Sequence, residues 1–186
     1  MILETDVRDF SDPTCDWTWY VYGALIGTSI LLERTHRTVL VAASVADRHL
    51  PDEAVRLRGH GFGTERMDMR ISGRDQTRVE KVEAVARSGI ARDTLRVCWQ
   101  NVAGTVNCGT CDKCVRTVAE LAATGCTGMI STLPTEVDLD LLAAHPAVTR
   151  SDRAFLTETR DAALAHDEPA VAAALDRALD AGTASS

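Results

Sequence analysis

The pattern of apolar and polar positions predicts an α/β arrangement in the first part of the chain. Trp17 to Leu32 has apolar side chains at helical spacing, and Gly23 and Gly27 would let a neighbouring element approach closely. We therefore expect a buried helix. The next apolar run, Thr38 to Ser44, is continuous and β-branched, as is typical of a strand covered on both faces. A helix followed by such a strand favours a parallel sheet.

A second βα unit is expected further along. Met67 to Ile71 alternates apolar and charged residues, which is the pattern of a half-buried strand. A turn at Ser72 to Asp75 follows, and Thr77 to Ser88 then has apolar residues on one helical face, with Gly89 as the expected C-terminal cap. Asp47 to Glu65 contains a proline and the string GHGFG, and is expected to be a long loop.

The last part of the chain is predicted to be mainly helical. Leu95 to Trp99 is expected to form a short strand, and Val115 to Thr124 a helix that ends at Gly125. Beyond Pro134 the composition shifts to Ala, Asp and Leu, and two amphipathic helices are predicted. Their expected core residues are Phe155, Leu156 and Thr159 on the first helix, and Val171, Leu175 and Leu179 on the second.

Composition narrows the class of partner. The 186 residues are 45% hydrophobic, which is enough for one domain with a substantial core. The formal charge of -7 works against nucleic acid as a partner, because a face that binds nucleic acid must be basic to displace counterions. Small molecules and proteins are the expected partners, and a homo-oligomer is left open.

The N-terminus and the apolar runs favour a cytoplasmic protein. Met1 to Phe10 lacks the basic region and apolar run of a secretion signal. The longest uncharged stretch, Trp17 to Leu32, is shorter than the roughly 20 residues that a membrane span needs, so we expect no membrane association. In a reducing compartment, cysteines are expected to bind metal rather than to form disulfides.

Four cysteines have the spacing of a metal site. Cys108, Cys111 and Cys114 form a C-x2-C-x2-C run, and Cys98 lies upstream of them. A C-x2-C turn folds two sulfurs onto one ion, and Gly109 permits a backbone geometry that a side chain would hinder. We interpret the segment as a knuckle that binds one structural zinc ion. Four protein ligands leave no open position for catalysis by the metal.

Other interpretations of the cysteines stay open. Four thiolates also suit an iron–sulfur cluster, and cysteines without metal are a third alternative. Four thiolates and a dication leave a negative charge, which Lys113, Arg116 and the N-terminus of the following helix would partly offset. Cys15 and Cys126 have no partner at ligand spacing and are expected to be small buried residues.

Three sequence segments follow one another along the chain: TRVEKVEAVARSGI, LRVCWQ and NCGTCDKCVRT. In the third segment, Arg116 follows shortly after the last cysteine. From Ile71 to Leu121 the chain thereby resembles the C-terminal half of the pyrophosphate-loop (PP-loop) ATP-dependent enzymes, which are adenine nucleotide alpha hydrolase-like, and particularly 7-cyano-7-deazaguanine synthase. The first string is similar to the family's Lys-bearing helix and the last to its zinc-binding segment. The upstream helix, strand and Gly-His loop resemble the family more loosely.

One motif of this family has no counterpart in the sequence. Its members grip the ATP pyrophosphate with an N-terminal Ser-Gly-Gly-x-Asp-Ser loop, and the nearest string here is Ser72-Gly73-Arg74-Asp75. Arg74 replaces the second glycine, although a phosphate loop needs small residues so that backbone N–H groups can reach the anion. The resemblance therefore implies either a partner chain that supplies the loop or a relative that no longer hydrolyses ATP.

Several residues are candidates for ligand binding. The resemblance places Lys81 near the nucleotide phosphates, and Arg78 on the same helix would share that role; the alternative for both is a solvated face paired with glutamates. His60 is a candidate substrate-binding residue, against the alternative of an ordinary loop histidine. Asp75 and Glu80 are candidates for magnesium, against the alternative of helix caps.

These observations predict an α/β fold with a small parallel sheet, packed helices, a four-cysteine zinc knuckle and a C-terminal helical extension. The α/β portion is expected over residues 1–132, with the knuckle at 98–114, and the extension over 133–186. The resemblance implies the zinc-binding half of a PP-loop ligase or amide-forming system that uses ATP and Mg²⁺ with a partner. A non-catalytic zinc-stabilised binding or scaffold protein is the alternative. A nucleic-acid-binding zinc knuckle conflicts with the negative charge.

Overall fold

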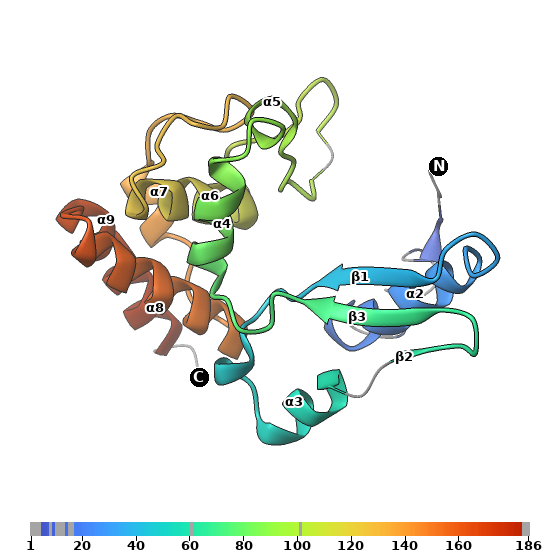
Figure 1. Ribbon diagram of the computed structural model, residues 1–186. Coiled ribbons are helices and arrows are strands. Elements are labelled where there is room, and N and C mark those ends of the chain that lie inside the picture. The colour runs from blue at the N-terminus through green and yellow to red at the C-terminus, as the bar shows by residue number, and fades with distance from the viewer. Residues whose placement is uncertain are drawn as a thin grey trace. The chain divides into compact units, whose positions relative to one another are not determined.

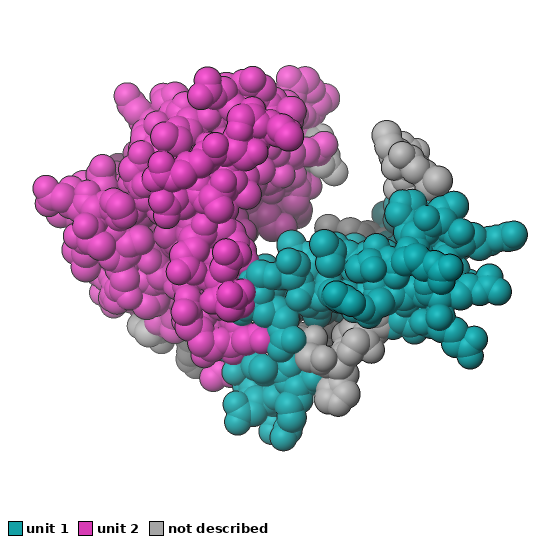
Figure 2. All heavy atoms as spheres, viewed as in Figure 1, with its two compact units in different colours: residues 1–43, 50–74 teal, residues 44–49, 75–186 magenta. Residues whose placement is uncertain are grey.

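The computed structural model describes residues 5–7, 9, 14, 17–59, 62–100 and 102–183. The chain divides into two compact units, which Figure 2 shows in teal and magenta. Unit 1 consists of residues 1–43 and 50–74, and unit 2 of residues 44–49 and 75–186. Each unit therefore combines two separate stretches of the sequence. The sequence-based boundary between residues 132 and 133 stays a prediction.

Unit 1 contains a three-stranded sheet with the order β1-β3-β2 (Figure 1). Strands β1 (Thr38–Ala42) and β3 (Asp68–Ser72) are parallel, and the short β2 (Phe62–Gly63) pairs with β3 in the antiparallel sense. The predicted small parallel sheet is thus confirmed for the β1–β3 pair. Helices α2 (Trp17–Ile30) and α3 (Asp52–Gly59) also belong to this unit.

The predicted burial of the first helix and strand is wrong. In β1, Leu40 is 67% exposed, and in and just after α2, Leu25 is 40% and Leu31 70% exposed. β1 lies at an edge of the sheet, and its side chains alternate between exposed and half-buried, so neither face of the strand is fully covered within the described residues. A Cβ atom added at Gly23 or Gly27 would meet nothing within 4 Å, so these glycines face open space rather than a close neighbour.

The predicted loop at 47–65 is also wrong. It contains a short 3-10 helix, η1 (Asp47–His49), the helix α3 and the strand β2. Pro51 followed by Asp52 and Glu53 is a good helix start, because proline fits the first turn and acidic residues favour the positive end of the helix dipole. His60 lies outside the described residues.

Unit 2 is a helical assembly around α6. Helix α6 packs on α4 and α8, while α8 and α7 both pack on α9 (Figure 1). The helices of this unit are α4 (Arg78–Ala86), α5 (Ala91–Thr94), α6 (Asp112–Ala123), α7 (Leu139–Ala143), α8 (Arg150–Ala165) and α9 (Pro169–Thr183).

Two apolar clusters form the core of unit 2, and α6 contributes to both. Val115 and Ala119 join a cluster with α7, α8 and α9, whereas Val118 and Leu121 join a second cluster with the cysteines and Ile130. Many of the residues between the helices are alanines, which lets the helix axes approach closely. The predicted core residues of the last two helices are confirmed as buried: Phe155, Leu156, Thr159, Val171, Leu175 and Leu179.

Capping chemistry explains where the helices of unit 2 begin. Thr77 and Glu80 form a capping box at the start of α4, and Thr77 is the residue at which this helix is predicted to begin. The helix ends at Ala86 with Arg87 as its cap, so the prediction of Gly89 as the cap is wrong. No strand forms over 95–99, because a side chain from the cysteine loop takes the backbone N–H groups there, as described below.

No helix in the described part of the chain combines the length and the apolar character needed to cross a membrane.

Candidate metal centre

The structure brings the four predicted cysteines together. Their Sγ atoms all lie within 4.8 Å of one another. Individual Sγ–Sγ distances are 3.4 Å for Cys111–Cys114, 3.9 Å for Cys108–Cys114 and 4.0 Å for Cys98–Cys111. Zinc–sulfur bonds of about 2.3 Å in a tetrahedron place sulfurs about 3.8 Å apart. The cluster therefore has the ligands and the size for one tetrahedral thiolate-bound metal ion.

Local backbone conformation sets these positions. Gly109 has φ +78°, a left-handed conformation that side chains rarely adopt, and a Cβ there would lie 3.2 Å from Pro134. Cys111 is the N-cap of α6, and Cys114 lies in the first turn of that helix. The predicted role of Gly109 in the turn is confirmed. Since two ligands lie at a helix N-terminus, the positive end of the helix dipole stabilises the negative charge of the thiolates.

The four sulfurs differ in environment. Hydrogen bonds from the backbone N–H groups of Thr110 and Cys111 lower the pKa of the Cys108 thiol to about 6. The Cys111 N–H lies 3.3 Å from Cys108 Sγ. In contrast, burial raises the pKa of Cys114, which is 0% exposed. A thiolate at Cys114 consequently needs a cation beside it, which is what a bound metal supplies.

Asn107 connects the segments that carry the ligands. Its Oδ1 accepts hydrogen bonds from the N–H groups of Val97 at 2.8 Å and Cys98 at 3.0 Å. Its Nδ2 donates to the carbonyl of Leu95 at 2.9 Å and to that of Thr132 at 3.1 Å. One half-buried amide thereby positions Cys98 against the loop that carries Cys108.

Asn107→Ala is expected to destabilise the folded state by about 2–3 kcal/mol, because it leaves half-buried backbone groups without partners. Metal affinity is expected to fall about 10–100-fold, the usual effect of removing a group that orients a ligand. Urea unfolding and competition with a zinc chelator measure the two effects. Gln100→Ala, at an exposed amide of the same loop, is the control and should change neither. Unchanged zinc affinity in the Asn107 variant would contradict this role.

A tryptophan lies beside the knuckle. Trp99 is 48% exposed, and its Nε1 donates to Asp112 Oδ1 at 2.8 Å. Because Asp112 lies in the first turn of α6, this bond ties the segment that follows Cys98 to the helix that carries Cys114.

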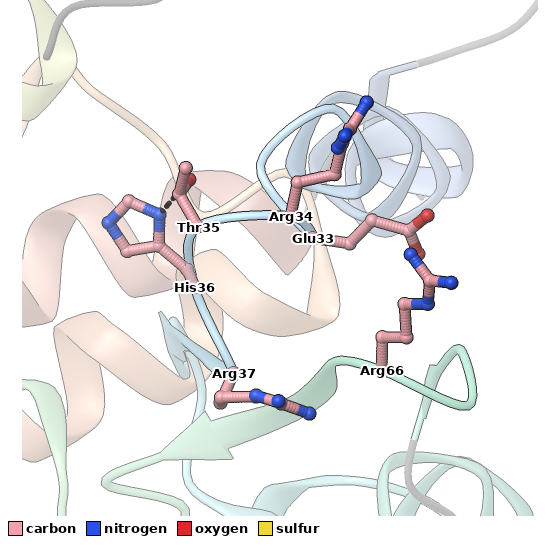
Figure 3. A pocket seen from close by; sticks show the side chains of 6 residues that line it. All are labelled: Glu33, Arg34, Thr35, His36, Arg37 and Arg66. Carbon is pink, nitrogen blue, oxygen red and sulfur yellow. Dashed lines mark hydrogen bonds between the residues drawn. The ribbon is translucent and has the colours of Figure 1, made fainter.

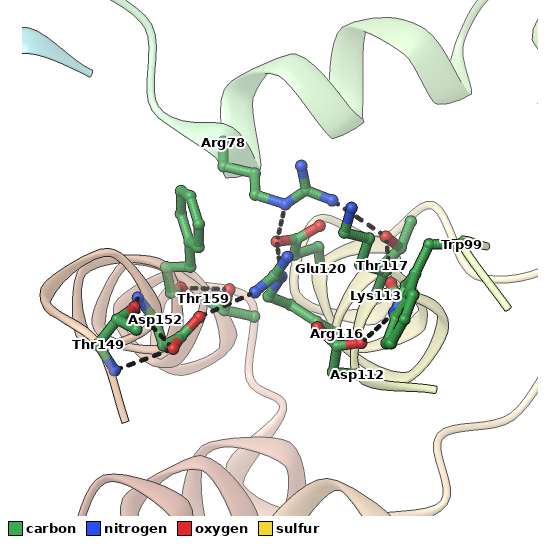
Figure 4. A network of polar contacts seen from close by, with 11 residues as sticks. Arg78, Trp99, Asp112, Lys113, Arg116, Thr117, Glu120, Thr149, Asp152 and Thr159 are labelled. Carbon is green, nitrogen blue, oxygen red and sulfur yellow. Dashed lines mark hydrogen bonds and ion pairs between the residues drawn. The ribbon is translucent and has the colours of Figure 1, made fainter. Parts of the chain in front are cut away.

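The predicted phosphate-binding Arg78 lies in a network of polar contacts between α4, α6 and α8 (Figure 4). Its Nε donates to Glu120 Oε1 at 2.7 Å, and its Nη2 donates to Thr117 Oγ1 at 3.2 Å. Its backbone N–H donates to Glu158. Glu120 is 0% exposed. The guanidinium of Arg78 is therefore committed to a buried carboxylate.

Arg116 completes the network. Its Nε lies 3.8 Å from Glu120 Oε1, its Nη1 lies 3.6 Å from Asp152, and its guanidinium lies over the ring of Phe155 at 4.7 Å from the centroid. Burial raises the pKa of Glu120 against the opposing effect of Arg78 and Arg116. Burial also lowers the pKa of Arg116. Arg116 therefore supplies, after Arg78, a second positive charge beside the buried carboxyl group of Glu120.

A pocket lies next to this network, with a volume of about 290 Å³. Arg116 and Asp112 from α6 line it together with His145, whose Nδ1 lies 2.7 Å from the Leu141 carbonyl. Apolar side chains form its walls: Val115, Leu142, Val148 and Leu156. It can take a small molecule with an apolar body and polar ends.

The other predicted ligand-binding residues are distributed differently. Lys81 is half-buried on α4, and its charge adds to the hydrogen bonds from Thr77 that lower the pKa of Glu80. Glu80 completes the capping box, which agrees with the alternative interpretation of this residue as a helix cap rather than a magnesium ligand. Arg74 donates to the Val55 carbonyl at 3.1 Å. Cys126 is buried, as predicted, whereas Cys15 lies outside the described residues.

The roles of Asn107 and Glu120 are not predicted from the sequence. An Asn immediately before a ligand cysteine was a weak signal, because asparagine often bonds nearby backbone. Glu120 falls among apolar residues of an amphipathic helix, and this placement is the signal that could identify it.

Comparison of the chain with protein-family models, with curated proteins and with solved structures finds no match.

Proposed function

We propose that the knuckle binds one structural Zn²⁺ through Cys98, Cys108, Cys111 and Cys114. The observation that carries the proposal is the clustering of four sulfurs within 4.8 Å. Zinc is favoured over an iron–sulfur cluster because one tetrahedral ion fills the space between sulfurs 3.4–4.0 Å apart, whereas a cluster needs wider spacing. With four protein ligands the ion organises structure and activates no water.

Metal analysis of the purified chain tests this proposal. We expect about one zinc per chain and no iron. Ligand-to-metal charge transfer after replacement by Co²⁺ should report four thiolates. A brown iron chromophore, or zinc well below one per chain after purification without chelators, would overturn the assignment.

For the whole chain, we propose the zinc-binding half of a PP-loop ATP-dependent ligase that acts with a partner. The support is the ordered resemblance of Ile71 to Leu121 together with the absence of the pyrophosphate loop from the sequence. In this proposal the partner grips the ATP pyrophosphate. AMP is transferred to a carboxylate or carbonyl oxygen with release of pyrophosphate, and a nitrogen nucleophile then displaces AMP.

Pyrophosphate release tests the need for a partner. The zinc-loaded chain alone, at millimolar ATP and Mg²⁺, is expected to release none. The complex recovered from native lysate through a tag on the chain is expected to bind ATP and, in the presence of its acceptor substrate, to release pyrophosphate. Release by the chain alone would refute the requirement for a partner.

A zinc-stabilised binding or scaffold protein without catalysis is the second candidate. The contacts of Arg78 favour it, because a guanidinium at 2.7 Å from a buried carboxylate is not available as a phosphate ligand without rearrangement. In that case the 290 Å³ pocket and the exposed faces are the binding surfaces, and the recovered complex binds no nucleotide.

A further inference from the structure

The pocket beside the polar network of unit 2 combines apolar walls with a few charged groups. Its volume of about 290 Å³ is roughly twice the 150 Å³ of a cavity that holds benzene. All of its lining belongs to unit 2. The apolar part of the lining is entirely aliphatic and consists of Val115, Leu142, Pro146, Val148 and Leu156. The space therefore suits a small aliphatic group, and we call it the Arg116 pocket after the arginine in its lining.

Arg116 is the strongest sign of a ligand in this pocket. Its side chain is 12% exposed, and its Nε is buried without a hydrogen-bond partner among the described residues. Its two ion pairs, 3.8 Å to Glu120 and 3.6 Å to Asp152, are longer than hydrogen bonds. Unmet donors in a protein interior are costly, so a buried guanidinium normally has acceptors around it. A ligand carboxylate supplies two acceptor oxygens in the planar arrangement that a guanidinium prefers.

A second cluster of arginines, in unit 1, lacks these features. It lines a pocket of about 250 Å³ that consists of Glu33, Arg34, Thr35, His36, Arg37 and Arg66 (Figure 3). The three arginines are exposed, and Arg34 and Arg37 point in different directions. Water satisfies the donors of an exposed guanidinium, so these arginines do not require a ligand. The buried position of Arg116 is what distinguishes its pocket.

The charges of the Arg116 pocket narrow the class of ligand. Asp112 and Asp152 line it together with Arg116, so two aspartates and one arginine give a formal charge of -1 with His145 neutral. A ligand with only a carboxylate would add a second uncompensated negative charge. A ligand with only an amine would leave the Arg116 Nε without an acceptor. A zwitterion supplies the acceptor and brings no net charge.

Acceptors for an ammonium group lie one helical turn from Arg116. Asp112 and Arg116 are four residues apart on α6, so their side chains extend from the same face of the helix (Figure 4). Asp112 Oδ1 accepts from Trp99 Nε1 at 2.8 Å, and Oδ2 has no donor among the described residues. His145 Nδ1 lies 2.7 Å from the Leu141 carbonyl oxygen. Because a carbonyl oxygen only accepts, Nδ1 carries the proton and Nε2 of the neutral ring is an acceptor.

We propose that the Arg116 pocket binds a free aliphatic α-amino acid such as leucine. The ligand carboxylate accepts hydrogen bonds from Arg116, and its ammonium group donates to Asp112 and His145. Its side chain lies against the aliphatic walls, which Leu142 and Val148 help to form. The proposal does not rest on the PP-loop relationship, because the pocket is built by unit 2 alone and can hold an amino acid with or without ATP chemistry.

Isothermal titration calorimetry on the full chain, with its zinc content measured first, tests the proposal with ligands of one carbon skeleton. Leucine is expected to bind with Kd below about 1 mM. Leucinamide lacks the carboxylate that Arg116 binds, and 4-methylpentanoate lacks the ammonium group that Asp112 binds. Both should bind at least about tenfold more weakly than leucine. This comparison leaves the buried contacts of Arg116 intact, which a substitution of that residue would disturb.

Asp112→Asn tests where the ammonium group binds. Asp112 is exposed, and asparagine retains an oxygen for the hydrogen bond from Trp99, so the fold should be unchanged. The variant should bind leucine at least about tenfold more weakly than wild type, yet bind 4-methylpentanoate no more weakly. Asp140→Asn is the matched control and should bind leucine like wild type. Asp140 is likewise an exposed aspartate in the first turn of a helix, α7, but it does not line the pocket.

Three results would overturn the proposal. They are the absence of leucine binding at about 10 mM ligand, equal affinities for leucine and leucinamide, and equal leucine affinities of the Asp112 and Asp140 variants. The zinc content and the pyrophosphate release described above are measured without leucine. Failure of the amino-acid site is therefore distinguishable from failure of the zinc site or of the ligase.

Discussion

Replacing Cys114 with serine is expected to release the metal and to unfold the knuckle together with the start of α6. Cys114 is 0% exposed and is the ligand deepest in the second apolar cluster of unit 2. Binding of a structural zinc ion contributes about 10–16 kcal/mol to folding in small zinc domains. In a chain of this size 1 kcal/mol shifts Tm by about 2–4 °C, so we expect Tm to fall by more than about 10 °C.

Cys126→Ser is the matched control for this experiment. Cys126 is also 0% exposed and lies in the same apolar cluster, but it is not one of the four cysteines whose sulfurs lie together. The same exchange of sulfur for oxygen should there cost about 1–2 kcal/mol and leave the zinc content unchanged. Thermal unfolding followed by circular dichroism, with metal analysis of each variant, makes the comparison. Equal losses in the two variants would show that packing, not metal binding, is what Cys114 supplies.

Replacing Glu120 with alanine is expected to be the most damaging change outside the knuckle. The substitution leaves Arg78 and Arg116 without the carboxylate that lies 2.7 Å and 3.8 Å from them. Breaking a buried ion pair by removing one partner costs about 3–5 kcal/mol. Chemical denaturation measures the loss. Glu83→Ala, which removes the exposed i,i+4 partner of Arg87, is the control and should cost below about 0.5 kcal/mol.

The pH dependence of folding stability tests the raised pKa of Glu120 separately from the cost of removing its carboxylate. Because the pKa of Glu120 is raised in the folded state, the folded chain holds this proton at pH values where the unfolded chain has lost it. Between the ordinary carboxyl value of 4.5 and the raised value, this group makes wild-type stability fall as pH rises. Glu120→Gln should lack this contribution, so wild type should lose stability relative to the Gln variant as pH rises through that window. A constant difference would contradict the raised pKa.

Local signals in the sequence predicted the elements that local interactions determine. The start of the helix at Thr77 and the apolar stripes of the last two helices depend on residues a few positions apart, and both predictions are confirmed. The cysteine spacing likewise predicted which sulfurs meet. The metal identity and the PP-loop relationship stay predictions.

The remaining features depend on contacts between distant residues. Whether TVLVA is covered depends on what lies beyond the sheet edge, and no pattern within the strand can state that. The extended segment at 95–99 has the composition of a strand, yet Asn107 rather than another strand satisfies its backbone. The division into two units could not be predicted either, because each unit joins stretches separated by the other.

If the knuckle binds zinc as proposed, helix α6 links the supply of this trace element to the lifetime of the protein. Its N-cap and first turn hold two of the four cysteines, and its later turns hold Glu120 and apolar residues of both clusters of unit 2. On the proposed zinc assignment, a chain made in zinc-starved cells lacks the anchor of its central helix and exposes that core to proteases. Its abundance should then follow zinc availability even when its synthesis does not, which pulse-chase labelling under zinc limitation can measure.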